Sequence, residues 1–98
     1  MTIEEVDKMI PNLVMKKLNI PCTREDKGKI MRRFMEDTIK YRQQLIDGVK
    51  VFLNDTDSVL CIPDKSRNIV HLNVETDEEQ KTNKLLENYK DIIQEYIR

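Results

Sequence analysis

The chain has 98 residues, and its two cysteines and one histidine are of the types most often found as zinc ligands or as a catalytic nucleophile and base. Cys22 and Cys61 lie far apart in the sequence, without a Cys-x-x-Cys motif, and this spacing does not match that of a metal site. Both lie in apolar stretches with no adjacent base, which favours buried free thiols over a catalytic nucleophile. His71 alternates with Val70 and Leu72, so we interpret it as a surface residue of a strand rather than a ligand or proton donor.

Charged residues are abundant, but their balance does not indicate a nucleic-acid or membrane partner. The 17 Lys and Arg nearly cancel the 18 Asp and Glu, which leaves a net charge of −1 and no global field toward either surface. One predicted helix face is basic, but Glu36 and Asp37 are interleaved in it. This pattern favours a solvated or interdomain face for its four cations, Lys29, Arg32, Arg33 and Lys40.

The length of the chain predicts a single domain covering residues 1–98. No apolar stretch is long enough to span a membrane, and the first residues lack the order of a signal peptide. Free thiols are typical of a reducing compartment. We therefore expect a cytoplasmic protein without a membrane partner.

Hydrophobic periodicity predicts three helices. The first is short and covers residues 2–10. A capping box at residues 23–26 begins the second, whose apolar stripe continues to Leu45. A second capping box at residues 76–79 begins the third, which keeps helical spacing to Tyr96.

Alternating apolar residues predict three or four strands. Residues 13–22 alternate loosely, as two weak strands or one broken strand, and Pro21 indicates a strand end or a sheet edge. Clearer strands follow at residues 49–53, 59–62 and 69–75. Because helices and sheets each need one face covered, we predict an α+β fold, with an antiparallel sheet of three to four strands and helices packed on one face.

The order of these residues resembles the last domain of the α-D-phosphohexomutases, the phosphoglucomutases and phosphomannomutases. Residues 45–51, Leu-Ile-Asp-Gly-Val-Lys-Val, resemble the start of the sheet hairpin in that domain. In the family a strand, a phosphate-binding loop, another strand and a closing helix follow. The same succession is predicted here through residues 59–62, 63–68 and 69–75 and the helix after Thr76.

Other segments are similar to one branch of the family, in which a mannose-1-phosphate guanylyltransferase-type nucleotidyltransferase is fused to a mutase-like C-terminal region. Residues 20–22, Ile-Pro-Cys, and residues 27–33, Lys-Gly-Lys-Ile-Met-Arg-Arg, carry this similarity, and Pro63-Asp64 and His71 also fit it. Together the similar segments extend over roughly residues 5–97, nearly the whole chain.

The loop at residues 62–68 departs from the family's phosphate motif, Arg-Pro-Ser-Gly-Thr-Glu-Pro. In that motif small residues let backbone N–H groups and hydroxyls close around a phosphate, and the arginine adds charge-assisted bonds. This chain keeps Pro63, has Ile62 in place of the arginine, and carries Asp64, whose charge repels phosphate. The resemblance implies weak phosphate binding by the residues that can still donate, Lys65, Ser66, Arg67 and Asn68.

The resemblance implies an accessory domain with a TATA-box-binding-protein-like fold that caps the active-site cleft and contacts the phosphate of a hexose phosphate. The family's phosphoserine and magnesium ligands belong to other domains, so we expect no catalytic residue, metal site or cofactor here, and an isolated chain without activity. The alternative is a structural or interdomain module of the nucleotidyltransferase fusion that no longer binds phosphosugar. The expected partners are the other domains of the parent chain and, weakly if at all, hexose phosphate. A third alternative is a regulatory protein that binds a partner through the basic helix face.

Overall fold

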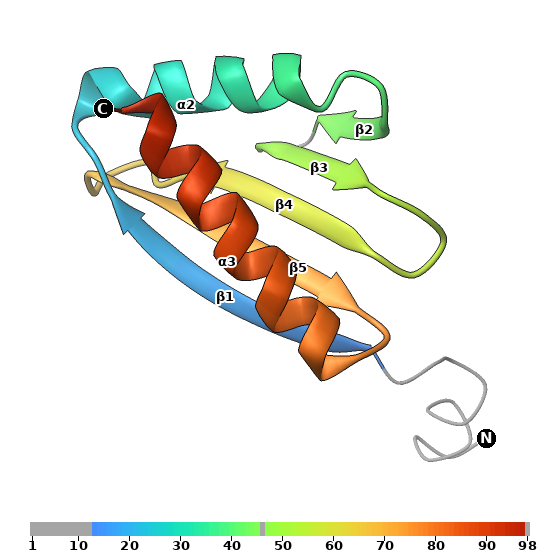
Figure 1. Ribbon diagram of the computed structural model, residues 1–98. Coiled ribbons are helices and arrows are strands. Elements are labelled where there is room, and N and C mark those ends of the chain that lie inside the picture. The colour runs from blue at the N-terminus through green and yellow to red at the C-terminus, as the bar shows by residue number, and fades with distance from the viewer. Residues whose placement is uncertain (1–12, 46, 98) are drawn as a thin grey trace, which may run out of the picture.

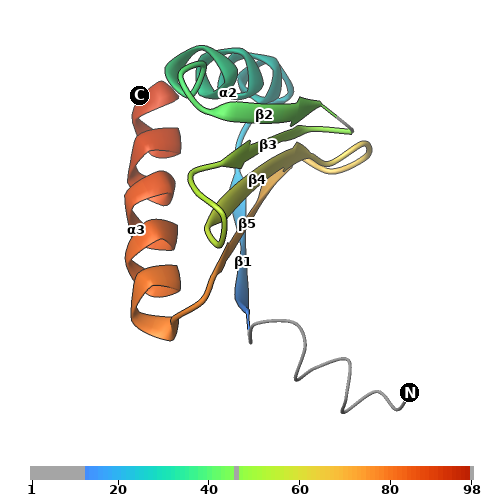
Figure 2. The same cartoon turned by 90° about the vertical axis from the view of Figure 1, so that its right-hand side faces the viewer.

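A computed structural model describes residues 13–45 and 47–97, which form an antiparallel five-stranded sheet with two helices on one face (Figures 1 and 2). The strand order is β1-β5-β4-β3-β2. The elements, in chain order, are β1 (Val14–Pro21), α2 (Arg24–Asp37), β2 (Arg42–Leu45), β3 (Val49–Phe52), β4 (Ser58–Pro63), β5 (Ile69–Thr76) and α3 (Glu79–Tyr96). The α+β class is confirmed. The predicted count of three to four strands is wrong, because it omits the edge strand β2. The helix predicted over residues 2–10 lies outside the described residues.

The second helix is shorter than its apolar stripe predicts, because the chain leaves the helix after Asp37. Thr38 Oγ1 donates to the Phe34 carbonyl oxygen at 2.6 Å, and Gln43 Nε2 donates to the Met35 carbonyl oxygen at 2.9 Å. The Phe34 carbonyl also accepts from the Thr38 amide at 3.2 Å, whereas the Met35 carbonyl is satisfied by the Gln43 side chain. Leu45, at the end of the predicted stripe, is 61% exposed and lies in β2.

The first strand is continuous rather than broken. All eight residues of β1 pair with β5, from Val14 opposite Thr76 to Pro21 opposite Ile69. Pro21 ends the strand, and β1 forms one edge of the sheet. The expectation of a strand end or sheet edge at Pro21 is therefore confirmed.

The core lies between the sheet and the two helices. In β5 every second side chain is fully buried on the helix side, through Val70, Leu72 and Val74. The α3 helix packs mainly on β5 and β1, and α2 packs on β4 and β3 (Figure 1). The two helices supply the other large side chains of the core, among them Ile30, Phe34, Ile93 and Tyr96.

The two helix starts differ in how well the sequence predicts them. The amide of Asp26 donates to Thr23 Oγ1 at 3.1 Å, so the predicted cap of α2 is confirmed. The predicted capping box at residues 76–79 is wrong. Thr76 pairs within the sheet, so α3 begins later, with Glu78 as N-cap and no side-chain capping bond.

Candidate functional site

The β4–β5 loop is the segment to which the resemblance assigns phosphate binding. It comprises residues 64–68, between Pro63 of β4 and Ile69 of β5. The Asp64 amide donates to the Ile69 carbonyl oxygen at 3.1 Å and closes the base of the loop. The Cys22 amide donates to the Asn68 carbonyl oxygen at 3.0 Å, which ties the loop to the start of α2. Figure 2 shows the loop projecting from the end of β4.

The carboxylate of Asp64 is the centre of this loop. Its Oδ1 accepts hydrogen bonds from the Ser66 amide at 2.9 Å and the Arg67 amide at 2.8 Å. Its Oδ2 accepts from Arg67 Nη2 at 3.1 Å and lies 2.9 Å from His71 Nε2. The amide and guanidinium groups that could bind an external phosphate are therefore directed at an internal anion.

Hydrogen bonding also fixes the charge of Asp64. The Arg67 amide, the His71 ring and the Ser66 amide hold the pKa of this carboxyl well below its ordinary value. Asp64 is consequently ionised at neutral pH. Its charge both occupies the donors of the loop and repels an approaching phosphate.

His71 lies on a strand, as predicted, but it is less exposed than a surface residue and has two polar partners. Its side chain is 27% exposed, on the face of β5 opposite the helices. Nδ1 lies 2.8 Å from Asn19 Oδ1 on β1, and Nε2 faces Asp64. Because an ionised carboxylate only accepts hydrogen bonds, Nε2 carries the hydrogen in this contact. His71 thus links the sheet to the loop.

Lys27 belongs to the loop, although the sequence gives no local signal for it. From the first turns of α2, its ammonium group donates to the Asp64 carbonyl oxygen at 2.9 Å and the Arg67 carbonyl oxygen at 3.0 Å. These contacts bridge the two ends of the turn. The charge of Lys27 is therefore used to hold the loop backbone.

The four predicted phosphate-binding residues lie in one loop but do not converge on a common space. The Ser66 and Arg67 donors turn toward Asp64. Lys65 is exposed and has no hydrogen bond or ion pair within residues 13–45 and 47–97. Asn68 is also exposed and contributes its backbone carbonyl to the Cys22 contact. Among the four, Lys65, the side-chain amide of Asn68 and the exposed edge of the Arg67 guanidinium are left for an external anion.

The cysteines remain free thiols in the structure. Cys61 is fully buried and its Sγ lies 3.7 Å from Met31 Sδ. Burial raises the pKa of Cys61 to about 12, and burial together with Asp26 raises the pKa of the partly exposed Cys22. Neither thiol is activated as a nucleophile. No group of three or more His, Cys, Asp or Glu among the described residues could hold a metal ion.

Lowering the pH is expected to open the loop around Asp64. Because its folded pKa is depressed, the carboxylate stabilises the fold above its unfolded pKa of about 4, and this contribution is lost as the pH falls through the folded value. We expect the Ser66 and Arg67 amide signals to titrate together, with a midpoint well below pH ~4. An NMR titration of wild type against Asp64→Asn tests this, since the variant cannot ionise and should lack the transition. A midpoint at the ordinary Asp value would contradict the hydrogen-bond arrangement.

Comparison with known proteins does not indicate a function, so a function must be inferred from the geometry of the site described above. No protein-family model matches the chain, and no curated protein matches it. Of the helices in the described part of the chain, none has both the length and the apolar character needed to cross a membrane.

Proposed function

We propose that this chain is a non-catalytic, cytoplasmic accessory domain of the phosphohexomutase C-terminal type, with a TATA-box-binding-protein-like fold. It acts as an interdomain module of a mannose-1-phosphate guanylyltransferase-type fusion protein. Two observations support the family assignment. The first is the succession of β4, a short loop, β5 and α3, which is the order that the resemblance implies. The second is that residues 49–51, from the segment that resembles the start of the family's sheet hairpin, lie in β3, which pairs antiparallel with β4.

The occupied loop is the observation that carries the choice of an interdomain module over a phosphate cap. Six donor groups of Ser66, Arg67 and His71 surround the Asp64 carboxylate. An incoming phosphate would have to displace this carboxylate and break those bonds. Its remaining charged contacts, to the exposed Lys65 and Arg67, are screened by water and contribute about 1 kcal/mol or less each.

A weak phosphosugar cap is the second candidate function. The exposure of Lys65, Ser66, Arg67 and Asn68 supports it, since a ligand held by the rest of a parent protein could reach them. In this case the domain would add contacts to a hexose phosphate bound elsewhere. The isolated chain would then bind hexose phosphate no tighter than millimolar, for which ~4 kcal/mol of binding free energy suffices.

A titration with glucose 1-phosphate separates the two candidates. For the interdomain module, amide signals of residues 62–68 in the wild-type chain should stay unchanged, with glucose as the control for the phosphate. If the loop is instead a weak cap, Asp64→Ser frees the Ser66 and Arg67 amides and removes a repulsive charge, so this variant should bind the ligand about fivefold more tightly than wild type, a gain of ~1 kcal/mol. Arg67→Ala in the Asp64→Ser background should reverse this gain. Clear millimolar binding by the wild-type loop would instead favour the cap.

A further inference from the structure

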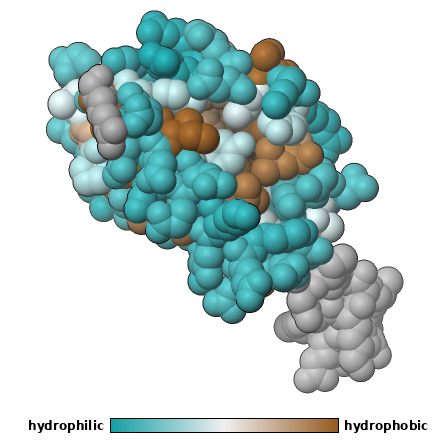
Figure 3. Space-filling model, in the orientation of Figure 1, coloured by the Kyte–Doolittle hydropathy of each residue, from teal (hydrophilic) through white to brown (hydrophobic). Residues whose placement is uncertain are grey.

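A small cavity lies on the helix side of the sheet, between α3 and the β3–β4 turn. Its volume is about 270 Å³ and it is lined by Leu53, Asp57, Lys81, Lys84, Leu85 and Asn88. The cavity arises because α3 packs on β5 and β1 while α2 packs on β4 and β3. Figure 3 shows brown hydrophobic surface beside α3 on this side of the molecule, surrounded by hydrophilic residues.

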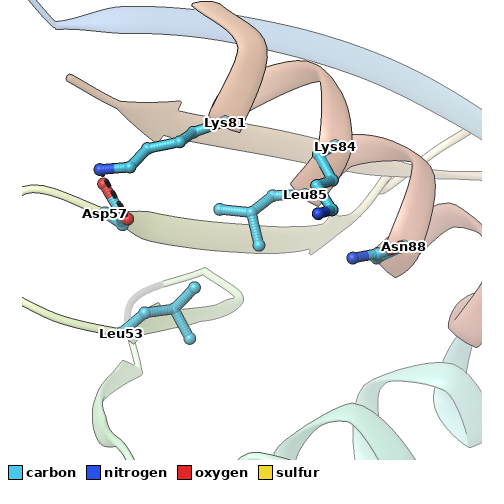
Figure 4. A pocket seen from close by; sticks show the side chains of 6 residues that line it. All are labelled: Leu53, Asp57, Lys81, Lys84, Leu85 and Asn88. Carbon is cyan, nitrogen blue, oxygen red and sulfur yellow. Dashed lines mark ion pairs between the residues drawn. The ribbon is translucent and has the colours of Figure 1, made fainter. Parts of the chain in front are cut away.

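The floor of the cavity is apolar and fixed in place. Leu53, just after β3, and Leu85, on α3, are half-buried and both pack against the hydrophobic core. Figure 4 shows the two side chains pointing into the same gap from opposite walls. An apolar group of a few carbon atoms that enters this gap would be removed from water on two sides.

On one side of the cavity, the charged side chains of Asp57 and Lys81 form ion pairs within the protein. Asp57 accepts hydrogen bonds from Asn54 and Thr56, at 3.1 and 2.9 Å, and lies 3.8 Å from Lys81. Lys81 also donates to Asp77 at 2.7 Å. The charges on this side are therefore paired within the protein, and Figure 4 shows Lys81 extended toward Asp57 and away from Leu85.

The other side of the cavity has unused polar groups. Lys84 and Asn88 are one turn apart on the same face of α3, and within the described segments neither makes a hydrogen bond or ion pair. In Figure 4 the Lys84 ammonium group and the Asn88 amide lie on the same side of Leu85. A cation and an amide donor beside an apolar floor are the groups that recognise a carboxylate attached to an apolar body.

We propose that this cavity binds a small monocarboxylate with a compact apolar body. The carboxylate contacts Lys84 and Asn88, and the apolar body lies between Leu53 and Leu85. A second negative charge at the far end would face Asp57, so a monoanion is preferred over a dicarboxylate. The volume of about 270 Å³ lies just below the usual range of ligand pockets, which begins at roughly 300 Å³, and this suits a ligand of only about four to six carbons. The site is distinct from the β4–β5 loop and does not depend on the proposed function.

Isocaproate is a suitable probe, because it joins one carboxylate to one branched aliphatic group. Added to the isotope-labelled chain up to roughly 10 mM, enough to saturate a millimolar site, it should shift the Leu53 and Leu85 methyl signals and the Lys84 and Asn88 amides. The neutral analogue isocaproamide should bind roughly threefold to fivefold more weakly, the range of an exposed ion pair. Acetate, which lacks the apolar body, should bind roughly tenfold more weakly than isocaproate.

A matched pair of lysine variants on α3 completes the test. Lys84→Ala should weaken isocaproate binding about threefold to fivefold and leave isocaproamide unchanged, because only the ion pair is removed. Lys90→Ala changes the same charge on the same helix, but its partner is Glu87 at 3.4 Å, outside the cavity, so isocaproate binding should be unaffected. Absence of shifts at these four residues, equal binding of acid and amide, or equal losses in the two variants would overturn the proposal.

Discussion

Replacing Ile93 by alanine is expected to destabilise the domain by about 2–5 kcal/mol, because the side chain is fully buried between α3 and the sheet. The cost combines the lost transfer of the aliphatic side chain from water with the cavity left behind. The strands next to α3 are held in place by their backbone hydrogen bonds, so their valine and leucine side chains can move only slightly into that cavity. A domain of this size has a total stability of ~5–15 kcal/mol, so the loss is a large fraction of it.

The neighbouring isoleucine is a matched control for this change. Ile92 is 39% exposed, whereas Ile93 is inaccessible to solvent, although both are isoleucines in the same turn of α3. Ile92→Ala should cost less than ~1 kcal/mol, and Leu86→Ala, at a partly buried position, should lie between the two. Urea unfolding followed by circular dichroism measures all three. If Ile93→Ala does not fold, Ile93→Val should still cost ~0.5–1.5 kcal/mol. Equal costs at residues 92 and 93 would contradict the placement of α3.

The parts of the fold that are predictable from the sequence are those in which one face of an element is buried. Strand β5 alternates between buried and partly exposed residues over its whole length, so its period of two is visible in the sequence. The α3 helix shows its buried face through residues such as Ile93 and Tyr96. The start of α2 is predictable for a different reason, since the Thr23 side chain caps the helix locally.

The edge strand β2 is not predictable in this way. Its four residues are mostly exposed and pair only with β3, so burial leaves no pattern in their sequence. Tyr41 and Leu45 continue the helical spacing of α2 by coincidence, and that spacing conceals the end of the helix at Asp37. The end depends on Gln43, whose side chain reaches back to the Met35 carbonyl oxygen, a contact that a periodicity analysis does not detect.

The candidate site is predictable in position but not in arrangement. The polar run at residues 64–68 marks a loop between two strands, and the structure places a loop there. The sequence does not show that the Asp64 carboxylate turns inward to accept from the Ser66 and Arg67 amides. The contribution of Lys27 depends on the packing of α2 beside the loop, which is tertiary information.

Gly48→Ala is the second substitution with a large expected effect. Gly48 lies directly before β3, and an added Cβ would come closer to the Cys61 carbonyl oxygen than such atoms ordinarily approach, and within 2.9 Å of Ile62 Cγ1. It would also lie 3.1 Å from Ile62 Cα. Two of these three neighbours are backbone atoms of β4, so relief requires β3 and β4 to separate where Val49 pairs with Cys61. Such overpacking is expected to cost about 1–3 kcal/mol.

Gly28, the other glycine of the chain, is the matched control, because there the same substitution by alanine should stabilise the domain rather than destabilise it. It lies in the interior of α2, where an added Cβ would meet no atom within 4 Å. Alanine restricts the unfolded chain and has the higher helix propensity, so Gly28→Ala should stabilise the domain by ~0.5–1 kcal/mol. Thermal and urea unfolding of the two variants therefore test the same chemical change in two environments. A neutral Gly48→Ala would mean that β3 and β4 do not approach as closely as the structure places them, because the backbone contact then could not exist.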